Sequence, residues 1–403
     1  MMAHSETPKA LDGVLVLDLS RILAGPTATQ MLGDLGATVI KIENPKSGGD
    51  DTRRWGPPYV ETPDGKSDLS AYFLAANRNK FSVAADLSTP EGQALVKQIA
   101  SQADILVENY KPGGLAKYGL DYPSLAALNP RLVYCSISGF GQTGPNKDRP
   151  GYDLMAQGFG GIMSITGDPD GPPTKVGVGI ADVMCGMYAT IGILAALRHA
   201  EATGEGQQID LALVDSQMAW LINEGTNTLA SGREPVRRGN AHPNIVPYDV
   251  FATADGHIIL AVGNDGQFQA FCNAMQREDL GADPDFETNL LRIAHRERLT
   301  QAISATFAAL PSEEILKRLH AAGVPAGPIH TIQQALSSDQ AKARGAVVPV
   351  SAATVSGQVE LLGNPLKFSK TPVHYAKAPP RFGQDTGAVD TLLSKHRKRG
   401  KSQ

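Results

Sequence analysis

Short β-branched runs alternate with helix-like segments through the first half of this sequence, and this alternation limits the fold more than any other feature. Runs at 14–20, 38–43, 81–87, 105–110 and 132–138 are typical of strands. Segments 26–35 and 89–102 lie between them and are typical of helices, with Pro or an N-cap residue near each start. The pattern predicts an α/β fold of the Rossmann-like kind, with a parallel sheet and helices on both faces.

The pattern changes in the second half. Residues 176–197 form a long, nearly uncharged stretch that predicts a helix, and a strand at 208–213 follows it. Further on, 248–253 and 257–262 flank Asp255-Gly256, which predicts a hairpin, and helical patterns follow at 265–275, 292–310 and 311–322. A short β segment is expected around 350–362.

These changes predict several parts in a chain of 403 residues, which is long enough for two cores. We expect a large domain at 1–221, a linker or lid at 222–246, a small α+β domain at 247–330 and a C-terminal segment at 331–403. The linker assignment rests on the Asn, Gly, Arg and Pro content of that stretch.

Composition narrows the function classes. A net charge of −4 gives no general attraction for nucleic acid or an anionic membrane. Three scattered cysteines indicate a reducing compartment, so we expect a cytoplasmic protein. The histidines show no HxxxH pairing, so no metal site is expected. Segment 176–197 has the length of a membrane span, but Asp182 and repeated Gly and Ala favour a core helix.

A GxGxxG pattern at 139–144 follows a predicted strand and raises the possibility of an NAD-dependent oxidoreductase. A dinucleotide site needs these glycines to open a helix, whereas Pro145 and Pro150 bracket a charged stretch typical of a loop. The pattern therefore favours a tight turn over a nucleotide site.

Asp182 is the only charged residue between 176 and 197. One interpretation is structural, because an Asp near a helix N-terminus accepts backbone N–H bonds and meets the helix dipole favourably. The other is chemical, because a partly desolvated carboxylate in a water-poor pocket can attack a thioester carbonyl. Cys185 is a rival nucleophile, but no basic residue lies near it in sequence, which favours a core position. From the residues alone both interpretations of Asp182 stay open.

Seven segments, matched in order and spacing, resemble the class III CoA-transferases of the formyl-CoA transferase type. They are 11–26, 35–45, 77–87, 103–120, 136–145, 149–167 and 178–197. The resemblance implies that Asp182 is a covalent nucleophile and that coenzyme A, as acyl-CoA, is a substrate rather than a tightly bound cofactor. It also implies an interlocked homodimer in which the C-terminal segment returns to the large domain.

The resemblance also implies which residues contact the ligands. Expected CoA contacts are Arg21, Ile22, Ala24, Asn77, Lys80, Asn109, Tyr110, Lys117, Tyr118 and Phe140. Expected contacts to the acyl or acid substrate are Gly141, Gln142, Tyr152, Arg237, Arg238 and His242. The last three are candidate cations for the distal carboxylate of a dicarboxylic acid.

Two departures from the family pattern carry consequences. Asn44 stands where relatives have a CoA-binding arginine, so Lys46 or Arg53 would have to supply the charge. Segment 237–249, with its GNAHPNIVPY pattern, replaces a glycine-rich lid and is more similar to the branch that moves CoA between succinyl-CoA and dicarboxylates such as glutarate or itaconate.

Two rival functions remain at this stage. An α-methylacyl-CoA racemase of the same fold needs a His base opposite the Asp, but Tyr152 occupies that position, and a tyrosine is a poor base at neutral pH. A non-catalytic acyl-CoA-binding module is the other alternative. The sequence therefore favours a CoA-transferase.

Overall fold

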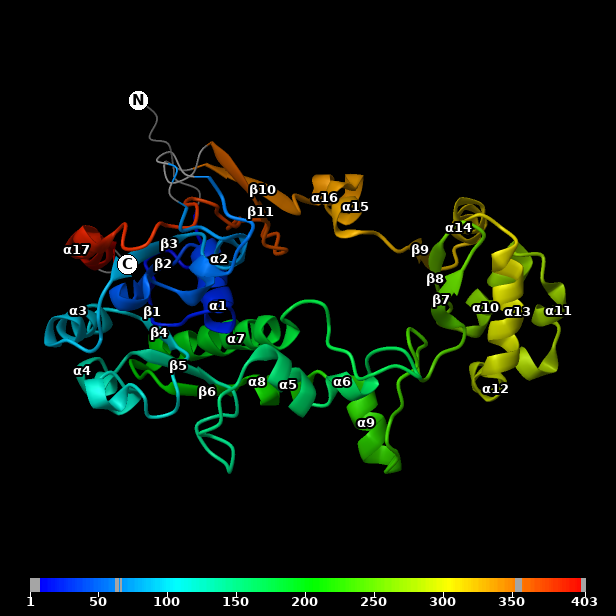
Figure 1. Cartoon of the computed structure of the whole chain (residues 1–403), viewed down its shortest axis with the longest axis horizontal. Coiled ribbons are helices and arrows are strands. Elements are labelled where there is room, and N and C mark those ends of the chain that lie inside the picture. The colour runs from blue at the N-terminus through cyan, green and yellow to red at the C-terminus, as the bar shows by residue number, and fades with distance from the viewer. Residues whose placement is uncertain (1–7, 62–64, 66, 352–356, 400–403) are drawn as a thin grey trace. The chain divides into compact units, whose positions relative to one another are not determined.

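The computed structural model describes residues 8–61, 65, 67–351 and 357–399 (Figure 1). The chain divides into two compact units. The sheet unit contains residues up to 162, 176–221 and 339 onward, and the hairpin unit contains 163–175 and 222–338. The hairpin unit is thus inserted into the chain of the sheet unit.

The sheet unit is built on six parallel strands. They are β1 (Leu15–Asp18), β2 (Thr38–Glu43), β3 (Lys80–Ala84), β4 (Ile105–Glu108), β5 (Val133–Ser138) and β6 (Gln208–Ala212). Their order is β3-β2-β1-β4-β5-β6, and every neighbouring pair is parallel. This order confirms the predicted α/β sheet and is that of a doubly wound Rossmann-like fold.

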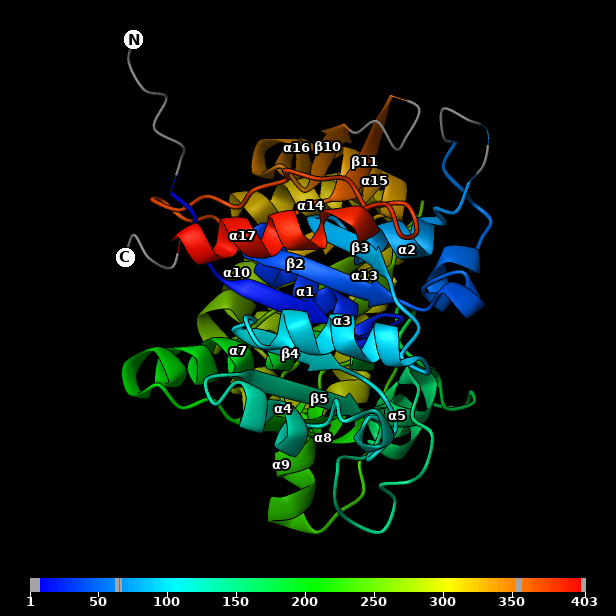
Figure 2. The same ribbon diagram turned by 90° about the vertical axis from the view of Figure 1, so that its left-hand side faces the viewer.

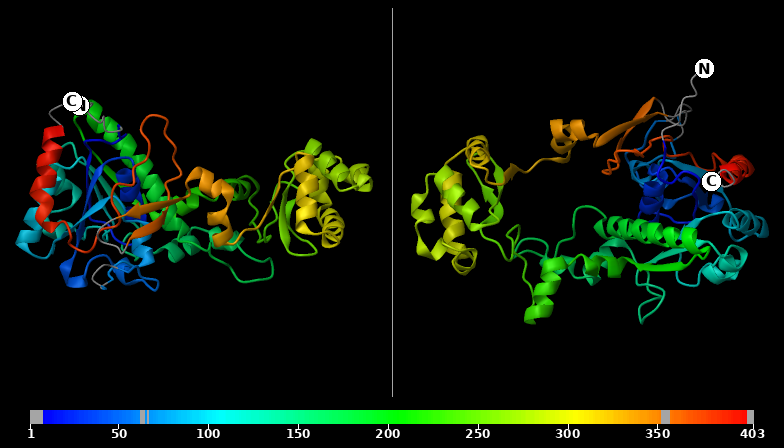
Figure 3. Two further views of the ribbon diagram at one scale, coloured as in Figure 1. Left: turned by 90° about the horizontal axis from the view of Figure 1, so that it is seen from above. Right: turned by 180° about the vertical axis from the view of Figure 1, so that it is seen from behind.

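Helices cover both faces of the sheet. Helices α3 (Pro90–Ala100), α4 (Tyr122–Leu128) and α17 (Val389–Arg399) lie over one face, in front of the strands in Figure 2. Helices α1 (Ala24–Asp34), α5 (Asp153–Phe159), α7 (Ile180–Thr203) and α8 (Leu213–Ala219) pack on the other. The left view of Figure 3 shows α17 (red) and α7 (green) on opposite sides of the strands.

Helix α7 is long and apolar enough to cross a membrane by length and composition, but a core helix passes the same test. Half of its most apolar window is buried inside the molecule. Cys185, Ala189, Ile193 and Ala196 recur at helical spacing on the buried side and pack in the core against β5. This packing supports a core helix.

The C-terminal part of the chain returns to the sheet unit. Strands β10 (Val347–Ser351) and β11 (Gln358–Leu362) form an antiparallel hairpin. The β segment expected over 350–362 falls partly on residues 352–356, outside the described residues. Asp34 is fully buried and accepts bonds from Arg78 at 2.8 and 2.6 Å, from Asn79 at 2.9 Å and from Asn364 at 3.1 Å. This carboxylate therefore connects α1 to the returning chain.

The hairpin unit has a core of its own. Strands β7 (Tyr248–Ala252), β8 (His257–Ala261) and β9 (Ala326–Pro328) form an antiparallel sheet, as expected for the first two. Its larger helices are α9 (Ile222–Ser231), α10 (Asp265–Ala274), α13 (Arg296–Ala308) and α14 (Ser312–Ala321). The helix predicted over 292–310 is broken at His295, so α12 (Asn289–Ala294) is separate.

The remaining helices are short. They are α2 (Ala71–Ala75), α6 (Ile162–Ile165), α11 (Glu278–Gly281), α15 (Ile332–Ser337) and α16 (Asp339–Arg344). Of these, α2 and α16 belong to the sheet unit and α11 and α15 to the hairpin unit.

Candidate active site

A cavity of about 420 Å³ opens at the carboxyl ends of β1, β4 and β5. The strand order reverses between β1 and β4, and ligands of doubly wound folds bind at such a switch point. Residues 21–24 after β1, 109–118 after β4 and 137–139 at the end of β5 supply most of the wall. The fold itself therefore places a ligand site here.

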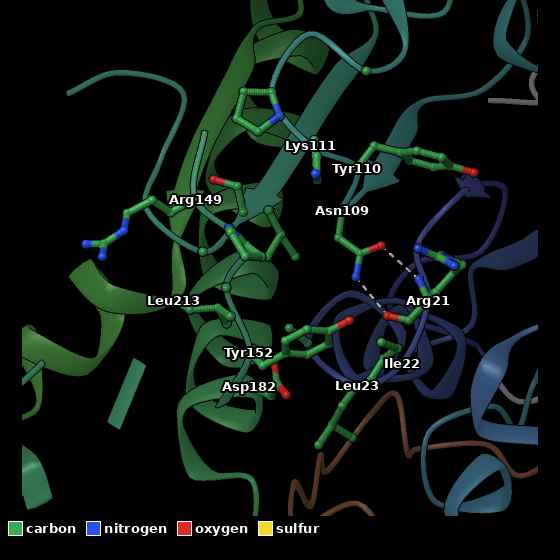
Figure 4. Close-up of a pocket in the computed structure, with 18 of the residues that line it drawn as sticks. Arg21, Ile22, Leu23, Asn109, Tyr110, Lys111, Arg149, Tyr152, Asp182 and Leu213 are labelled. Atoms are coloured by element: carbon green, nitrogen blue, oxygen red, sulfur yellow. Dashed lines mark hydrogen bonds between the residues drawn. The ribbon is translucent and has the colours of Figure 1, made fainter. Parts of the chain in front are cut away.

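Asp182 lines this cavity from the first turn of α7 (Figure 4). Among the described residues, no side chain or backbone group donates a hydrogen bond to its carboxylate. The backbone N–H groups of Ala181 and Asp182 instead point to Asp153 Oδ1, at 2.8 and 3.4 Å. Asp153 therefore caps the helix, and the carboxylate of Asp182 is left facing the cavity.

The surroundings of Asp182 disfavour its charged form. Burial is the main cause and the nearby Asp153 carboxylate the second, and together they raise the pKa of Asp182 to about 7. A carboxylate that is costly to ionise is a stronger base and nucleophile than one in water, so the position has the electrostatics of a reactive group.

Two tyrosines stand close to this carboxylate. Tyr152 is exposed and lines the cavity beside Asp182 (Figure 4). Tyr72, on α2, is half-buried, and its pKa is raised by burial and then by the charges of Asp182, Asp153 and Asp50. Neither Tyr72 nor Asp153 was among the site residues expected from the sequence. Asp153 could have been found, because it directly follows Tyr152 in a segment that resembles the family.

Cationic side chains gather around the cavity. Arg21, Lys111, Lys117 and Arg149 line it, and only Arg21 and Lys117 were expected. The Arg21 guanidinium lies 5.9 Å from the Tyr110 ring and the Lys117 ammonium 4.8 Å from the Tyr118 ring. Such a rim suits the phosphates of an anionic ligand.

The other expected CoA contacts divide into two groups. Ile22, Ala24, Asn109, Tyr110 and Tyr118 line the cavity as well. Asn77 and Lys80 do not, since both side chains are fully buried. Lys80 Nζ pairs with Asp18 at 3.1 Å and bonds to Asn77 Oδ1 at 3.1 Å, so the positive charge is used inside the protein. Both residues therefore lie in the interior of the sheet unit, and their contact with CoA stays a prediction.

Phe140, Gly141 and Gln142 lie beyond the cavity wall. Phe140 packs edge-on against Phe159 at 5.1 Å, and the Gln142 N–H donates to Asp210. The glycine-rich stretch at 139–144 is a loop, as expected, in which Gly139 approaches Gly151 so closely that a Cβ at Gly139 would lie 2.5 Å from the Gly151 Cα.

A second cavity, of about 300 Å³, adjoins the first, because Tyr110 and Tyr118 line both. Asn44 and Lys46 line this second cavity, but Lys46 Nζ already pairs with Asp86 at 2.8 Å. Arg53 is buried and pairs with Glu43 at 2.7 Å. Arg53 is therefore not a substitute for the arginine missing at position 44.

Arg237, Arg238 and His242 belong to the hairpin unit. Arg237 donates to the carbonyls of Asp168 and Gly171 at 3.1 and 2.7 Å, and Arg238 pairs with Glu224 at 3.3 Å. His242 Nδ1 accepts the Asn244 N–H at 3.0 Å, which leaves the ring proton on Nε2. Segment 237–249 is thus held by defined contacts within this unit.

Groups of three or more His, Cys, Asp or Glu that could hold a metal ion are not found in the described part of the chain. The three cysteines are buried and unpaired. Burial first raises the pKa of Cys185 to about 12, so this thiol is not a nucleophile at neutral pH.

Comparison with known proteins decides the family. The model of CoA-transferase family III matches residues 11–386. The chain belongs to CoA-transferase family III. It is therefore an enzyme that uses CoA thioesters as substrates, and the cavity between β1 and β4 is the candidate place for them.

Two relatives and one solved structure are similar to this chain over nearly its whole length. The succinate–glutarate CoA-transferase of Agrobacterium fabrum is 51% identical over 94% of this chain and 94% of its own length. The succinyl-CoA:glutarate CoA-transferase of Mus musculus is 42% identical over 96% of this chain and 90% of its own. A CaiB/BaiF family protein from Brucella suis has 44% identity and a TM-score of 0.85, covering 96% of this chain and all of that one.

Proposed function

We propose that this CoA-transferase moves CoA from succinyl-CoA to glutarate or a similar dicarboxylate, with Asp182 as the covalent nucleophile. The observation that supports the nucleophile is the Asp182 carboxylate, which faces the cavity, has no hydrogen-bond donor among the residues that the structure describes and has a pKa raised to about 7. The acids are proposed because relatives with 51% and 42% identity are named for succinate or succinyl-CoA and glutarate.

The proposed reaction has four balanced steps. Asp182 attacks the thioester carbonyl, forming a mixed anhydride and releasing CoA thiolate. The thiolate attacks the Asp182 acyl carbon, giving an aspartyl-CoA thioester and free succinate. The acceptor carboxylate attacks that thioester, which forms a new anhydride and releases the thiolate again. The thiolate then takes the acyl group of the acceptor, and Asp182 is regenerated.

Water would hydrolyse each of these intermediates, so the site has to be closed during transfer. Both the glycine-rich loop at 139–144 and segment 237–249 remain proposals for this role. Support for the loop comes from the positive φ of Gly141 (86°) and Gly144 (87°), which lets the backbone turn tightly.

The distal carboxylate of a dicarboxylic acid needs a cation. Arg237, Arg238 and His242 keep this role as proposals. Arg237 is already bonded to two backbone carbonyls and Arg238 to Glu224. Burial first lowers the pKa of His242, so its ring offers an Nε2 proton as a hydrogen-bond donor rather than a positive charge.

The racemase alternative is disfavoured by Tyr152, which stands beside Asp182 in the cavity where a second base would be needed. None of the lining residues of this cavity is a histidine. A two-base proton exchange therefore lacks its partner.

We also propose an interlocked homodimer with a separate small domain, located in the cytoplasm. Self-association is supported by exposed apolar side chains, among them Leu229 at 90% and Ile222 at 68% exposure. A reducing location is supported by the unpaired cysteines.

The nucleophile is tested by incubating the enzyme with succinyl-CoA, quenching with hydroxylamine or borohydride, and locating the modified residue by mass spectrometry. We expect the label on Asp182 of the wild-type enzyme. Asp182→Asn is expected to lose both the label and the transfer activity. A label on another residue, or full transfer by Asp182→Asn, contradicts the proposal.

The acceptor is tested by a screen with glutarate, itaconate, mesaconate, citramalate, oxalate, formate and carnitine. Glutarate or a related dicarboxylate is expected to give the highest kcat/KM. A preference for formate, oxalate or carnitine would contradict the proposed acid while leaving the nucleophile untouched.

A further inference from the structure

Residues 20–23, here called the Ile22 turn, connect β1 to α1 and form part of the cavity wall. Ile22 has a φ of 73°, in the left-handed region that β-branched residues avoid. Four non-glycine residues of the described chain have a positive φ, and Ile22 is the one among them that lines the cavity. Such strain persists only where the surroundings impose it.

Side chains from other segments impose this conformation. Asn109 Oδ1 accepts the Arg21 N–H at 2.9 Å while its Nδ2 donates to the Arg21 carbonyl at 2.8 Å (Figure 4). Asp50 accepts the Ile22 N–H with both oxygens at 3.3 Å. The backbone of Arg21 and Ile22 is thus held by hydrogen bonds to two side chains from other segments.

The preceding residue is held in the same manner. Asp18 Oδ1 accepts the Ser20 N–H at 2.9 Å, and Lys41 Nζ donates to the Ser20 carbonyl at 2.7 Å. Five successive backbone groups, from the Ser20 N–H to the Ile22 N–H, therefore bond to side chains. With these five bonds in place, the backbone of the turn is not free to relax to an unstrained conformation.

The charges that supply these bonds are buried beneath the turn. Lys41 and Asp50 pair at 2.9 Å with both side chains at 0% exposure, and Lys80 and Asp18 pair at 3.1 Å, also at 0%. Buried ion pairs contribute little net stability compared with apolar packing, because desolvating the charges is costly. Stability alone is thus a weak reason for four buried charges at this place.

We propose that the Ile22 turn is a preorganised wall of the acyl-transfer cavity and that Asp50 is a positioning residue that holds it. Ile22 and Leu23 then stand in fixed places opposite Asp182, where the thioester has to align for attack. The proposal rests on the proposed function in that the reaction measured is CoA transfer.

The decisive variant is Ile22→Gly, because glycine adopts a positive φ without strain. Relief of the strain is expected to leave Tm unchanged or raised, while loss of the Ile22 side chain from the wall lowers kcat between about tenfold and a hundredfold. KM for acyl-CoA is expected to change by less than about threefold, since the cationic side chains that line the cavity are untouched. Ile22→Ala, which keeps a Cβ on the strained backbone, is expected to lose less.

Gln276→Gly is the matched control. Gln276 also has a positive φ, 56°, but lies between α10 and α11 in the hairpin unit and is not among the residues that line the cavity. The Tm of Gln276→Gly is expected to be unchanged or raised, with kcat as in the wild type. A kcat for Ile22→Gly within about twofold of wild type, a lowered Tm for that variant, or an equal loss in Ile22→Ala would each overturn the proposal.

Asp50 is tested by a double-mutant cycle. Asp50→Asn is expected to lower kcat in the wild-type background but to add little in the Ile22→Gly background, where glycine adopts the positive φ without having to be held. If Asp50→Asn lowers kcat by the same factor in both backgrounds, Asp50 has a merely structural role. If Asp50→Asn does not fold, the Ile22 variants still decide on the turn.

Failure of this inference can be told from failure of the proposed function. Wild-type protein without transfer from succinyl-CoA would refute the donor assignment, and the variants would then be compared with the CoA thioester that is active. Wild-type activity that Ile22→Gly retains would refute the turn alone.

Discussion

Asp182 changes charge near neutrality, because burial and then the Asp153 carboxylate raise its pKa to about 7. Only the ionised carboxylate can attack a thioester, so kcat/KM for acyl-CoA is expected to fall as the pH drops below about 7 and to level off above it. Initial rates between pH 5 and pH 9 with saturating acceptor measure this, with pH extremes chosen about two units either side of the midpoint. A profile flat down to pH 5 would contradict the assignment.

Asp153→Asn tests the second cause of the raised pKa of Asp182. Asparagine still offers an oxygen to the Ala181 N–H, but the negative charge is gone, so the pKa of Asp182 falls and the midpoint of the pH profile moves to lower pH. Glu91→Gln, an exposed charge removed on α3, is the control and leaves the midpoint in place. An unchanged midpoint in Asp153→Asn would show that its charge does not reach Asp182.

Helices α1 and α7 meet at Gly186, one turn after Asp182, where an added Cβ would lie 2.7 Å from the Ala24 carbonyl oxygen. Gly186→Ala is therefore expected to push the helices apart and to lower both Tm and kcat, although alanine is the better helix former. Gly192→Ala on the same helix would meet only Ile209 at 3.7 Å and is expected to raise stability by about 0.5–1 kcal/mol. Equal behaviour of the two variants in thermal unfolding would contradict this packing.

Most strands of the sheet unit could be predicted because they are short runs rich in apolar and β-branched residues. The break at His295 could not, because the residues around it include no Gly or Pro that would mark the end of a helix. The burial of Lys80 and Asn77 was also beyond the sequence, since a lysine that pairs with a buried acid far away in the chain looks the same as a solvated one. Asp153 as the cap of α7 needed the fold to bring the two segments together.

The buried carboxylate of Asp34 connects distant parts of the chain, because it joins α1 to residues before and after the inserted hairpin unit. Asp34→Ala leaves the buried Arg78 guanidinium without its counterion, and unfolding free energy is expected to fall by about 3–5 kcal/mol in urea titrations. Asp339→Ala removes an exposed carboxylate 3.6 Å from Lys342 and is expected to change little. A loss of less than about 1 kcal/mol for Asp34→Ala would mean that the returning chain is held by other contacts.

The late return of the chain has a consequence for biosynthesis. One face of the sheet is completed by Val389, Leu392 and Leu393 of α17, so that core lacks a wall until those residues have left the ribosome. All of residues 222–338 are made earlier and carry a core of their own. During translation the second unit can therefore fold while the first still exposes apolar surface, and nascent chains of this enzyme are open to aggregation until α17 packs on the sheet.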